Sequence, residues 1–287
     1  MVALKTVLCP VDFSAATPRQ LDLAAELSRA FGARLVVHHN LQSFGTGASV
    51  GWMWNAGHDN PQAAAEARLR ECVSRVPEDV PVEPLITEGP NSRAVLTVAE
   101  AADADLVLLT AHETMSEDHA SITEKMLEHG RRAVLVLHEP ARESCIPHFA
   151  SKSNEPQTVL VPTDLSPGSR AAIELGVDLA RRLPIELHLL HVLPRTRSRD
   201  EPAEEKVSSQ LRALVLEDLG TRVTVHVDYG DPAEAIARVA RQLSAACIVM
   251  GGHTRRPLGR MFSRDTSREV LHQAQCPVWY VPAVRES

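Results

Sequence analysis

Aromatic residues, paired cysteines and long hydrophobic runs are scarce in this sequence. Aromatic residues make up 3% of its 287 residues although 44% are hydrophobic, which favours an aliphatic core of the α/β kind. No run approaches the roughly 18 apolar residues of a membrane span. The five cysteines show no Cys-x-x-Cys spacing and indicate reduced thiols. The chain enters a strand-like segment without a signal-type stretch, so we expect a cytoplasmic protein that does not bind membranes.

Excess positive charge and catalytic motifs are lacking as well. The net charge of −7 argues against non-specific nucleic-acid binding, and we expect no nucleic-acid partner. The sequence contains neither the phosphate-binding pattern G-x4-G-K-(S/T) nor the nucleophile pattern G-x-S-x-G. We therefore expect that the protein is not an enzyme and has no catalytic residues.

What the sequence does contain is an internal repeat. The segment V-L-C-P-V-D-F-S at 7–14 returns as V-L-V-P-T-D-L-S at 159–166, an offset of 152 residues. Farther along, A-D-L-V-L-L at 104–109 matches A-A-C-I-V-M at 245–250 with an offset of 141 residues. The shorter offset indicates an insertion in the first copy, which we place at 44–60.

Each copy alternates apolar, strand-like segments with segments of helical period. Strands are expected near 5–11, 34–40, 82–87, 105–110 and 133–138, and near 158–163, 185–192, 222–228, 247–251 and 278–281. Helices are expected near 18–31, 62–76, 92–102 and 121–131. Nearly continuous Val, Leu and Ile strands imply burial on both faces, as in a parallel sheet. The predicted fold class is α/β, with two tandem doubly wound, mostly parallel five-stranded sheets and helices on both faces.

The repeat also predicts the domain organisation. The first domain is expected to span residues 1–140, a Pro-rich polar linker 141–156, and the second domain 157–287. Exposed hydrophobic edge strands aggregate, so the apolar runs 134–137 and 278–281 are expected to pair and join the two domains as an intramolecular pseudo-dimer. A homodimer is a further expectation.

The segment 248–278 is the candidate ligand site. It reads as a strand end, a loop rich in Gly and Arg, and a helix leading to another strand. Such a loop presents backbone N–H groups and a helix N-terminus to an anion, for which phosphate is the usual choice.

Several motifs together resemble the universal stress protein family. These are V-P-x-D-x-S at 161–166, which the first copy repeats as C-P-x-D-x-S at 9–14, G-D-P-A-E-A-I at 230–236, V-M-G-x-H at 249–253 and C-P-V at 276–278. The resemblance covers both copies and implies a tandem stress-response protein of the adenine nucleotide alpha hydrolase-like fold. Many members of the family bind ATP through G-x2-G-x9-G-(S/T) and the Asp of the first strand, whereas others bind no nucleotide.

Neither copy keeps that phosphate motif intact. In the second copy its positions are Gly251, Thr254, Arg264 and Asp265; in the first copy they are Thr110, Glu113, Ala120 and Ser121. Arg264 adds a side chain where the triphosphate would pass, although a guanidinium also binds phosphate. Asp265 suits a helix N-cap, but its charge repels phosphate.

Nucleotide, if bound, is therefore assigned to the second copy. Residues 1–150 carry 12 Lys and Arg against 20 Asp and Glu, whereas residues 151–287 carry 18 against 17. ATP is the expected cofactor, and the candidate residues of the second copy are Pro162, Thr163, Asp164, Val192, Met250, Gly251, His253, Thr254, Arg264, Asp265 and Thr266. In the first copy the candidates are Asp12 and Ser121. Helix capping is the alternative role for the strand-one aspartates, favoured for Asp12, while nucleotide contact is favoured for Asp164.

Two other features leave alternatives open. The insertion contains Trp52, Met53 and Trp54, which either form a contact surface or fold onto their own domain. His38, His39, His58 and His112 suit zinc by residue type, but their spacing is not that of a helical ligand pair, and no metal is expected. The leading hypothesis is a non-catalytic universal stress protein with degenerate nucleotide binding. A nucleotide-independent scaffold is the alternative, and a slow ATPase is the third.

Overall fold

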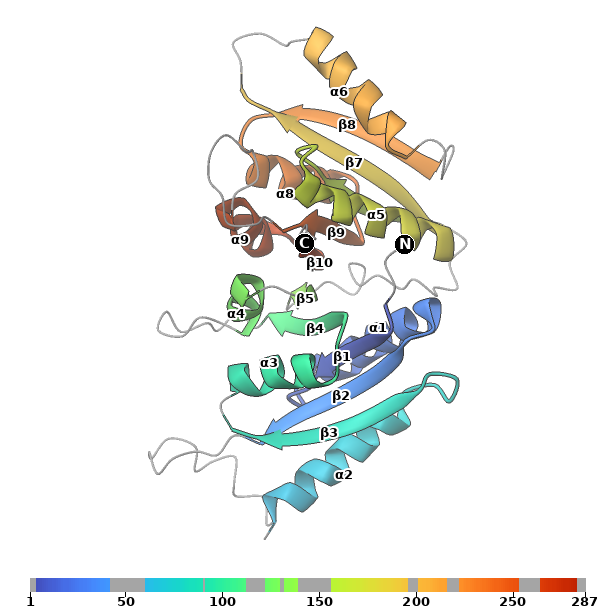
Figure 1. Cartoon of the computed structure of the whole chain (residues 1–287), viewed down its shortest axis with the longest axis vertical. Coiled ribbons are helices and arrows are strands. Elements are labelled where there is room, and N and C mark those ends of the chain that lie inside the picture. Colours follow the sequence, from blue (N-terminus) through green and yellow to red (C-terminus); the bar gives the residue numbers. More distant parts are fainter. Residues whose placement is uncertain are drawn as a thin grey trace. The chain divides into compact units, whose positions relative to one another are not determined.

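The computed structural model describes residues 4–41, 60–89, 91–111, 122–129, 132–138, 156–195, 201–215, 222–252 and 264–282. Strands and helices alternate along the chain (Figure 1). In the first copy they are β1 (Thr6–Pro10), α1 (Thr17–Phe31), β2 (Arg34–Leu41), α2 (Pro61–Ser74), β3 (Val82–Glu88), α3 (Asn91–Ala101), β4 (Leu106–Ala111), α4 (Ile122–His129) and β5 (Ala133–His138). In the second copy they are β6 (Gln157–Pro162), α5 (Pro167–Arg182), β7 (Ile185–Leu193), α6 (Glu201–Ala213), β8 (Val223–Tyr229), α8 (Pro232–Gln242), β9 (Cys247–Gly251), α9 (Arg264–Gln273) and β10 (Val278–Val281).

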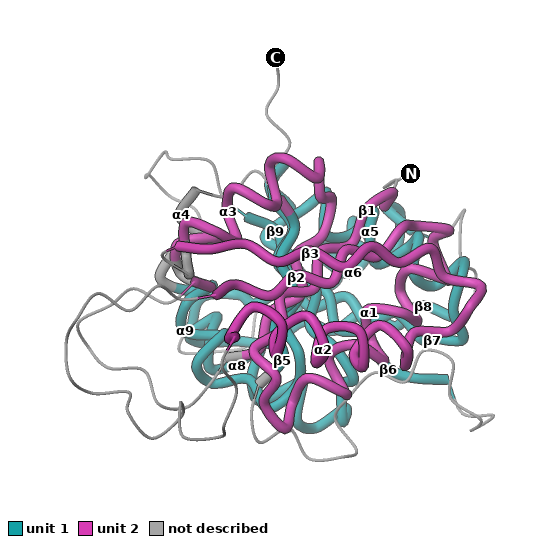
Figure 2. Tube along the Cα trace, turned by 90° about the horizontal axis from the view of Figure 1, so that it is seen from below, with its two compact units in different colours: residues 1–3, 133–287 teal, residues 4–132 magenta. Residues whose placement is uncertain are grey.

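The chain forms two compact units, which divide it between Arg132 and Ala133 (Figure 2). Strand β5 closes the first sequence copy but belongs to the second unit, where it pairs antiparallel with β10. In that ladder Leu135 lies opposite Trp279. The predicted pairing of 134–137 with 278–281 is confirmed, and each apolar strand covers an edge of the other. The predicted domain boundaries at 140 and 156 remain predictions.

Each unit contains a doubly wound, mostly parallel sheet, as predicted, but the described strands divide as four and six between the units and not as the expected five and five. In the unit Leu4–Arg132 the strand order is β3-β2-β1-β4, with parallel pairing throughout. In the second unit the order is β5-β10-β9-β6-β7-β8, and only the β5–β10 pair is antiparallel. Fully buried Val and Leu side chains fill the central strands, because helices cover both faces.

The strand order reverses at the first strand of each copy. The chain runs from β1 to β2 and β3, and then returns to place β4 on the other side of β1. The second copy repeats this path from β6 through β7 and β8 to β9. Right-handed crossovers in opposite directions place the helices on opposite faces and open a crevice at the carboxyl ends of the strands. The candidate ligand site lies at this position.

The backbone repeats in detail as well as in topology. Phe13 and its counterpart Leu165 both have φ of 60°, in the turn that follows the first strand of each copy. Gly89 and Gly230, which follow the third strand, have φ of 127° and 122°. A bulky side chain in the left-handed region costs on the order of 1–3 kcal/mol. The turn conformation is therefore maintained in both copies at the expense of strain.

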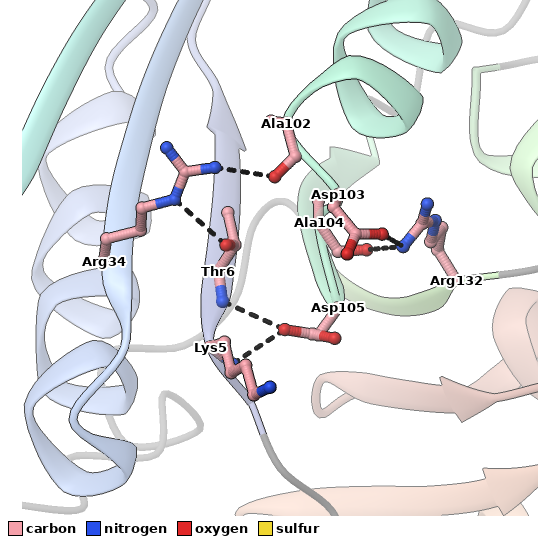
Figure 3. Close-up of polar contacts among 8 residues, drawn as sticks. All are labelled: Lys5, Thr6, Arg34, Ala102, Asp103, Ala104, Asp105 and Arg132. Carbon is pink, nitrogen blue, oxygen red and sulfur yellow. Dashed lines mark hydrogen bonds and ion pairs between the residues drawn. The ribbon is translucent and has the colours of Figure 1, made fainter.

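The amino ends of the first sheet are held by the protein's own polar groups (Figure 3). The Asp105 carboxylate accepts hydrogen bonds from the backbone N–H groups of Lys5 (2.7 Å) and Thr6 (3.0 Å). Arg34 donates to the Thr6 hydroxyl and the Ala102 carbonyl oxygen, and Arg132 donates to Asp103 and the Ala104 carbonyl oxygen. These contacts stabilise the end of the first sheet that lies opposite the carboxyl ends of its own strands.

None of the described helices is long and apolar enough to cross a membrane.

Candidate functional site

The site in the second copy begins at the turn between β6 and α5. The Asp164 Oδ1 atom accepts a hydrogen bond from the Ser166 N–H (3.0 Å), which closes the turn around Leu165. Ser166 is the N-cap of α5 and its hydroxyl accepts from the Ser169 N–H. Within the described part of the chain, the Asp164 Oδ2 atom has no hydrogen-bond partner. One carboxylate oxygen is therefore used by the fold and the other remains available at the strand end.

Thr163 positions this turn and is itself buried. The Ser169 hydroxyl uses its proton to donate to the Ser166 carbonyl oxygen. In the contact between Thr163 and Ser169 (2.8 Å) the Thr163 hydroxyl is therefore the donor. The Thr163 hydroxyl also accepts a hydrogen bond from the Leu165 N–H. The Thr163 carbonyl oxygen accepts from His191 Nδ1–H (2.7 Å), and burial lowers the pKa of that histidine. The side chain of Thr163 is thus occupied in holding the loop.

Val192 is fully buried as a whole residue, so only the direction of its peptide group bears on the site. On the β6 side the Leu190 carbonyl oxygen accepts a hydrogen bond from the Thr163 N–H, and on the β8 side the Leu193 carbonyl oxygen accepts one from the Gly230 N–H. Because peptide groups of alternate residues in a strand face opposite neighbours, the Val192 N–H and C=O face the β6 side beyond the end of β6. No backbone group of the described residues pairs with them there.

Gly251 is required by packing. A Cβ atom at this position would overlap the Gly168 carbonyl oxygen and lie 2.8 Å from the Ser169 Cα atom. The end of β9 therefore lies directly against the start of α5. This contact explains the glycine without a ligand, so its presence alone is no evidence for phosphate binding.

The next residue meets a different neighbour. A Cβ atom at Gly252 would lie 2.6 Å from the Tyr280 hydroxyl oxygen. Tyr280 lies on β10 and thus packs against the start of the loop that leads to α9. Met250 and Pro162 are buried beside these residues in β9 and β6.

Helix α9 carries the remaining candidates of the second copy. Arg264 and Asp265 lie in its first turn, but their side chains lie outside the described residues, as do His253 and Thr254. Thr266 and Ser267 are buried at 7% and 6% exposure. The Ser267 hydroxyl has no hydrogen-bond partner among the described residues. The sequence comparison missed Ser267 because the family motif ends two residues earlier.

In the first copy, other side chains occupy the equivalent turn. The Asp12 Oδ1 atom accepts from the Ser14 N–H (2.9 Å) and the Thr17 hydroxyl (3.3 Å). Ala16, not Asp12 or Ser14, is the N-cap of α1, so the expected capping by Asp12 is wrong: its carboxylate closes the loop before the helix. The Phe13 ring stacks on His39 with centroids 4.1 Å apart, and the Arg68 guanidinium lies 4.6 Å from its centroid. This stack covers the turn.

The helix packing also differs at the strand switch point. Gln20 of α1 is 1% exposed, and its Nε2 donates to the carbonyl oxygens of Pro10 and Leu108, both at 2.8 Å. Its counterpart in α5, 152 residues later, is Ala172. The glutamine side chain thus joins α1 to β1 and β4, and the first copy has Thr110 at the position of Gly251. Pairing Gln20 with Ala172 in the repeat could have revealed this difference.

The first-copy histidines are used in separate local contacts. The Thr87 hydroxyl donates its proton to Asn40 Oδ1, so in its contact with His38 (2.7 Å) the Thr87 oxygen accepts from His38 Nε2–H. His39 Nδ1–H donates to the Val11 carbonyl oxygen. Successive strand residues point to opposite faces, so His38 and His39 are not on one side of the sheet. No metal-binding group of three or more His, Cys, Asp or Glu occurs among the described residues. His58, His112, Ser121 and the Trp52–Trp54 segment lie outside them.

The fold defines a class: tandem doubly wound α/β domains whose strand order reverses at the first strand of each copy. The sequence profile of the Universal stress protein family matches residues 3–138 and 156–282. The chain belongs to the universal stress protein family, and this membership supports a role in stress response.

Individual relatives agree with this assignment. Universal stress protein MJ0531 of Methanocaldococcus jannaschii is 27% identical over 136 residues, which cover 43% of this chain and 80% of that protein. The crystal structure of a universal stress protein from Archaeoglobus fulgidus DSM 4304 has a TM-score of 0.71 at 20% identity, with coverage of 98% of this chain and 97% of that one. The functionally unknown protein PA1789 from Pseudomonas aeruginosa PAO1 has a TM-score of 0.67 at 15% identity, with coverage of 98% and 93%. The solved structures are similar in fold.

Proposed function

We propose that this protein is a non-catalytic stress-response protein that binds one adenine nucleotide, preferably ATP, weakly in its second copy. The single observation that carries this proposal is that the Asp164 Oδ2 atom and the Val192 peptide group, at the ends of β6 and β7, have no hydrogen-bond partner among the described residues. Asp164 and the Val192 peptide flank the same strand ends, because the Thr163 carbonyl bonds His191 between them.

These groups match the polar edge of adenine. Adenine presents an amino donor beside a ring-nitrogen acceptor, while guanine presents the reverse arrangement of a carbonyl acceptor beside an N–H donor. The Val192 N–H donates to the ring nitrogen, and the Val192 carbonyl oxygen or Asp164 Oδ2 accepts from the amino group. A buried polar edge of this kind discriminates strongly against a ligand that presents the wrong pattern.

The phosphate end of the site explains why binding is weak. The first turn of α9 offers N–H groups, and the buried Ser267 hydroxyl adds a donor of the kind that phosphate accepts. Asp265 opposes this, because a carboxylate at a helix start competes for the same N–H groups. Arg264 supplies a compensating positive charge. The adenine edge therefore dominates the affinity.

Co-purification and thermal stability test the proposal. Mass spectrometry of the purified protein after mild denaturation is expected to detect bound adenine nucleotide, and millimolar ATP is expected to raise the melting temperature more than GTP does. Equal shifts with ATP and GTP would remove the argument from Asp164 and Val192. No bound nucleotide together with no shift would overturn the proposed function.

The double substitution Arg264→Gly and Asp265→Ser tests the phosphate end. It restores the glycine and hydroxyl of the family motif, and we expect about tenfold tighter ATP binding because the repelling carboxylate is removed. Adenosine, which has no phosphate, serves as the control ligand and should bind both proteins equally. If ATP binding stays unchanged, Asp265 does not weaken the site.

A further inference from the structure

The first copy contains a pocket that is separate from the strand switch point of the second copy. It lies between the start of α1 and the face of α2 that carries Arg68, Glu71 and Cys72, and it has a volume of about 150 Å³. That volume accommodates roughly ten non-hydrogen atoms. Phe13, Pro18, Leu21 and Cys72 form its apolar lining, and Ser14 and Thr17 lie at its edge. We call it the α1–α2 pocket.

Two arginines border this pocket, Arg68 in α2 and Arg75 directly after it. Arg68 is held in place, since its Nη2 donates to the Phe13 carbonyl oxygen (3.2 Å) and its guanidinium lies over the Phe13 ring. That contact uses one N–H of the guanidinium, which has five. The backbone N–H of Arg75, one residue beyond the helix end, donates to the Cys72 carbonyl oxygen, but its guanidinium has no hydrogen bond or ion pair within the described part of the chain. Both guanidinium groups therefore have donors to offer an anion.

The charges of the pocket select the charge of its ligand. Arg68 and Arg75 supply two positive charges, and Glu71 on the same helix supplies one negative charge. The balance of one positive charge suits a monoanion, because Glu71 would repel a second negative charge on the ligand. The apolar lining requires a hydrophobic body attached to the anionic group.

We propose that the α1–α2 pocket binds a small organic monocarboxylate with an apolar body. The carboxylate accepts hydrogen bonds from Arg75 and from the remaining N–H groups of Arg68. The apolar part contacts the Phe13 ring and the Leu21 and Cys72 side chains. This site is independent of nucleotide binding in the second copy.

The second copy differs at the corresponding helix. Helix α6 begins with the acidic residues Glu201 and Glu204, and Glu204 Oε1 accepts a hydrogen bond from the Tyr229 hydroxyl at 2.8 Å. The counterpart of Phe13 is Leu165, so the second copy lacks the aromatic ring over which an arginine lies in the first. The proposed site is therefore a property of the first copy.

Binding of benzoate to the full-length protein tests this inference. Benzoate is the probe, and benzyl alcohol is its neutral control of similar size. Titration monitored by ligand-observed NMR is expected to show saturable binding of benzoate and at least about tenfold weaker binding of benzyl alcohol, because only the carboxylate engages the arginines.

Matched variants locate the site on α2. Arg75→Gln is expected to weaken benzoate binding about tenfold, whereas Arg70→Gln, on the same helix but outside the pocket, should leave it unchanged. Glu71→Gln is expected to tighten binding, which keeps the test informative if a loss variant folds poorly. Benzoate should also slow alkylation of Cys72 in peptide maps of the native protein.

Three results would overturn the proposal. They are the absence of saturable benzoate binding, equal weakening by Arg75→Gln and Arg70→Gln, and equal affinity for benzoate and benzyl alcohol. Binding that persists in Arg75→Gln while Cys72 alkylation is unaffected would place the carboxylate elsewhere on the chain.

Discussion

The two copies share a backbone but use the carboxyl ends of their strands differently. Both have a strained residue after the first-strand Asp, Phe13 or Leu165, at φ of 60°. In the first copy the turn is covered by the Phe13 ring and Arg68, and Gln20 fills the space between α1 and the strands. In the second copy the helix lies against β9, and Asp164 retains an oxygen without a partner among the described residues.

The comparison teaches that the turn is a property of the scaffold, whereas availability for a ligand depends on a few side chains. Asp12 and Asp164 make the same bond to the N–H two residues later. Asp12 also accepts a hydrogen bond from the Thr17 hydroxyl. The counterpart of Thr17 is Ser169, whose hydroxyl instead hydrogen bonds with the Thr163 hydroxyl and the Ser166 carbonyl oxygen. Identical aspartates in identical turns are thus left with different capacity to bind.

The largest effect is expected from a substitution that disrupts the close contact between β9 and the start of α5 in the second copy. Gly251→Ala places a methyl group against the backbone of Gly168 and Ser169, which cannot move as a flexible side chain would. We expect a loss of about 3 kcal/mol or more in the free energy of unfolding, measured by denaturant titration. Thr110→Ala at the matched position of the first copy should cost less than about 1 kcal/mol. Equal effects would refute the asymmetry in packing.

A smaller effect is expected from removing the glutamine that separates α1 from the strands. Gln20→Ala deletes two buried hydrogen bonds and leaves the carbonyl oxygens of Pro10 and Leu108 without that donor. The expected loss is about 2 kcal/mol in the free energy of unfolding. Calorimetry of the variant checks this value. If the free energy of unfolding is unchanged, α1 packs directly against β4 in the variant, as α5 packs against β9.

An effect of similar size, confined to acidic pH, concerns a buried histidine whose position in the second copy is apolar. Burial lowers the pKa of His38 from 6.5 to about 4, and its counterpart in the second copy is Leu190. Between these pH values the unfolded chain takes up a proton that the folded protein does not, so stability falls as pH falls. Above pH 6.5 the histidine is neutral in both states and has no such effect.

His38→Leu should therefore reduce the loss of stability on acidification. The expected reduction between neutral pH and pH 4 is on the order of 2 kcal/mol, measured by urea unfolding across that range. His38 hydrogen bonds Thr87, so a small constant loss at neutral pH is also expected. An unchanged pH dependence would show that the other histidines account for acid sensitivity.

Much of the fold could be predicted from the sequence because its signals are local or repeated. Continuous Val and Leu runs identified the parallel strands, and the offset of 152 residues located the second copy. The need to cover two apolar edges predicted the pairing of β5 with β10. These arguments depend on which side chains are buried, and the pattern of apolar residues in the sequence indicates this directly.

The candidate site was less predictable because it depends on contacts between distant residues. Nothing in the sequence around Gly251 indicates that Gly168 lies against it, so the glycine was assigned to phosphate. Likewise, the hydrogen bonds of Gln20 join residues 88 positions apart, to Leu108. The contribution of the Val192 peptide follows from strand register, and its assignment required the family resemblance.

Isothermal titration of ATP into a matched pair of variants tests the central claim most directly. Asp164→Ala removes the carboxylate whose Oδ2 atom has no partner among the described residues, and Asp12→Ala removes its counterpart in the first copy. We predict one ATP per chain in the unaltered protein, about tenfold weaker binding in Asp164→Ala, and unchanged binding in Asp12→Ala. Two ATP molecules per chain, or equal weakening by the two substitutions, would contradict the account.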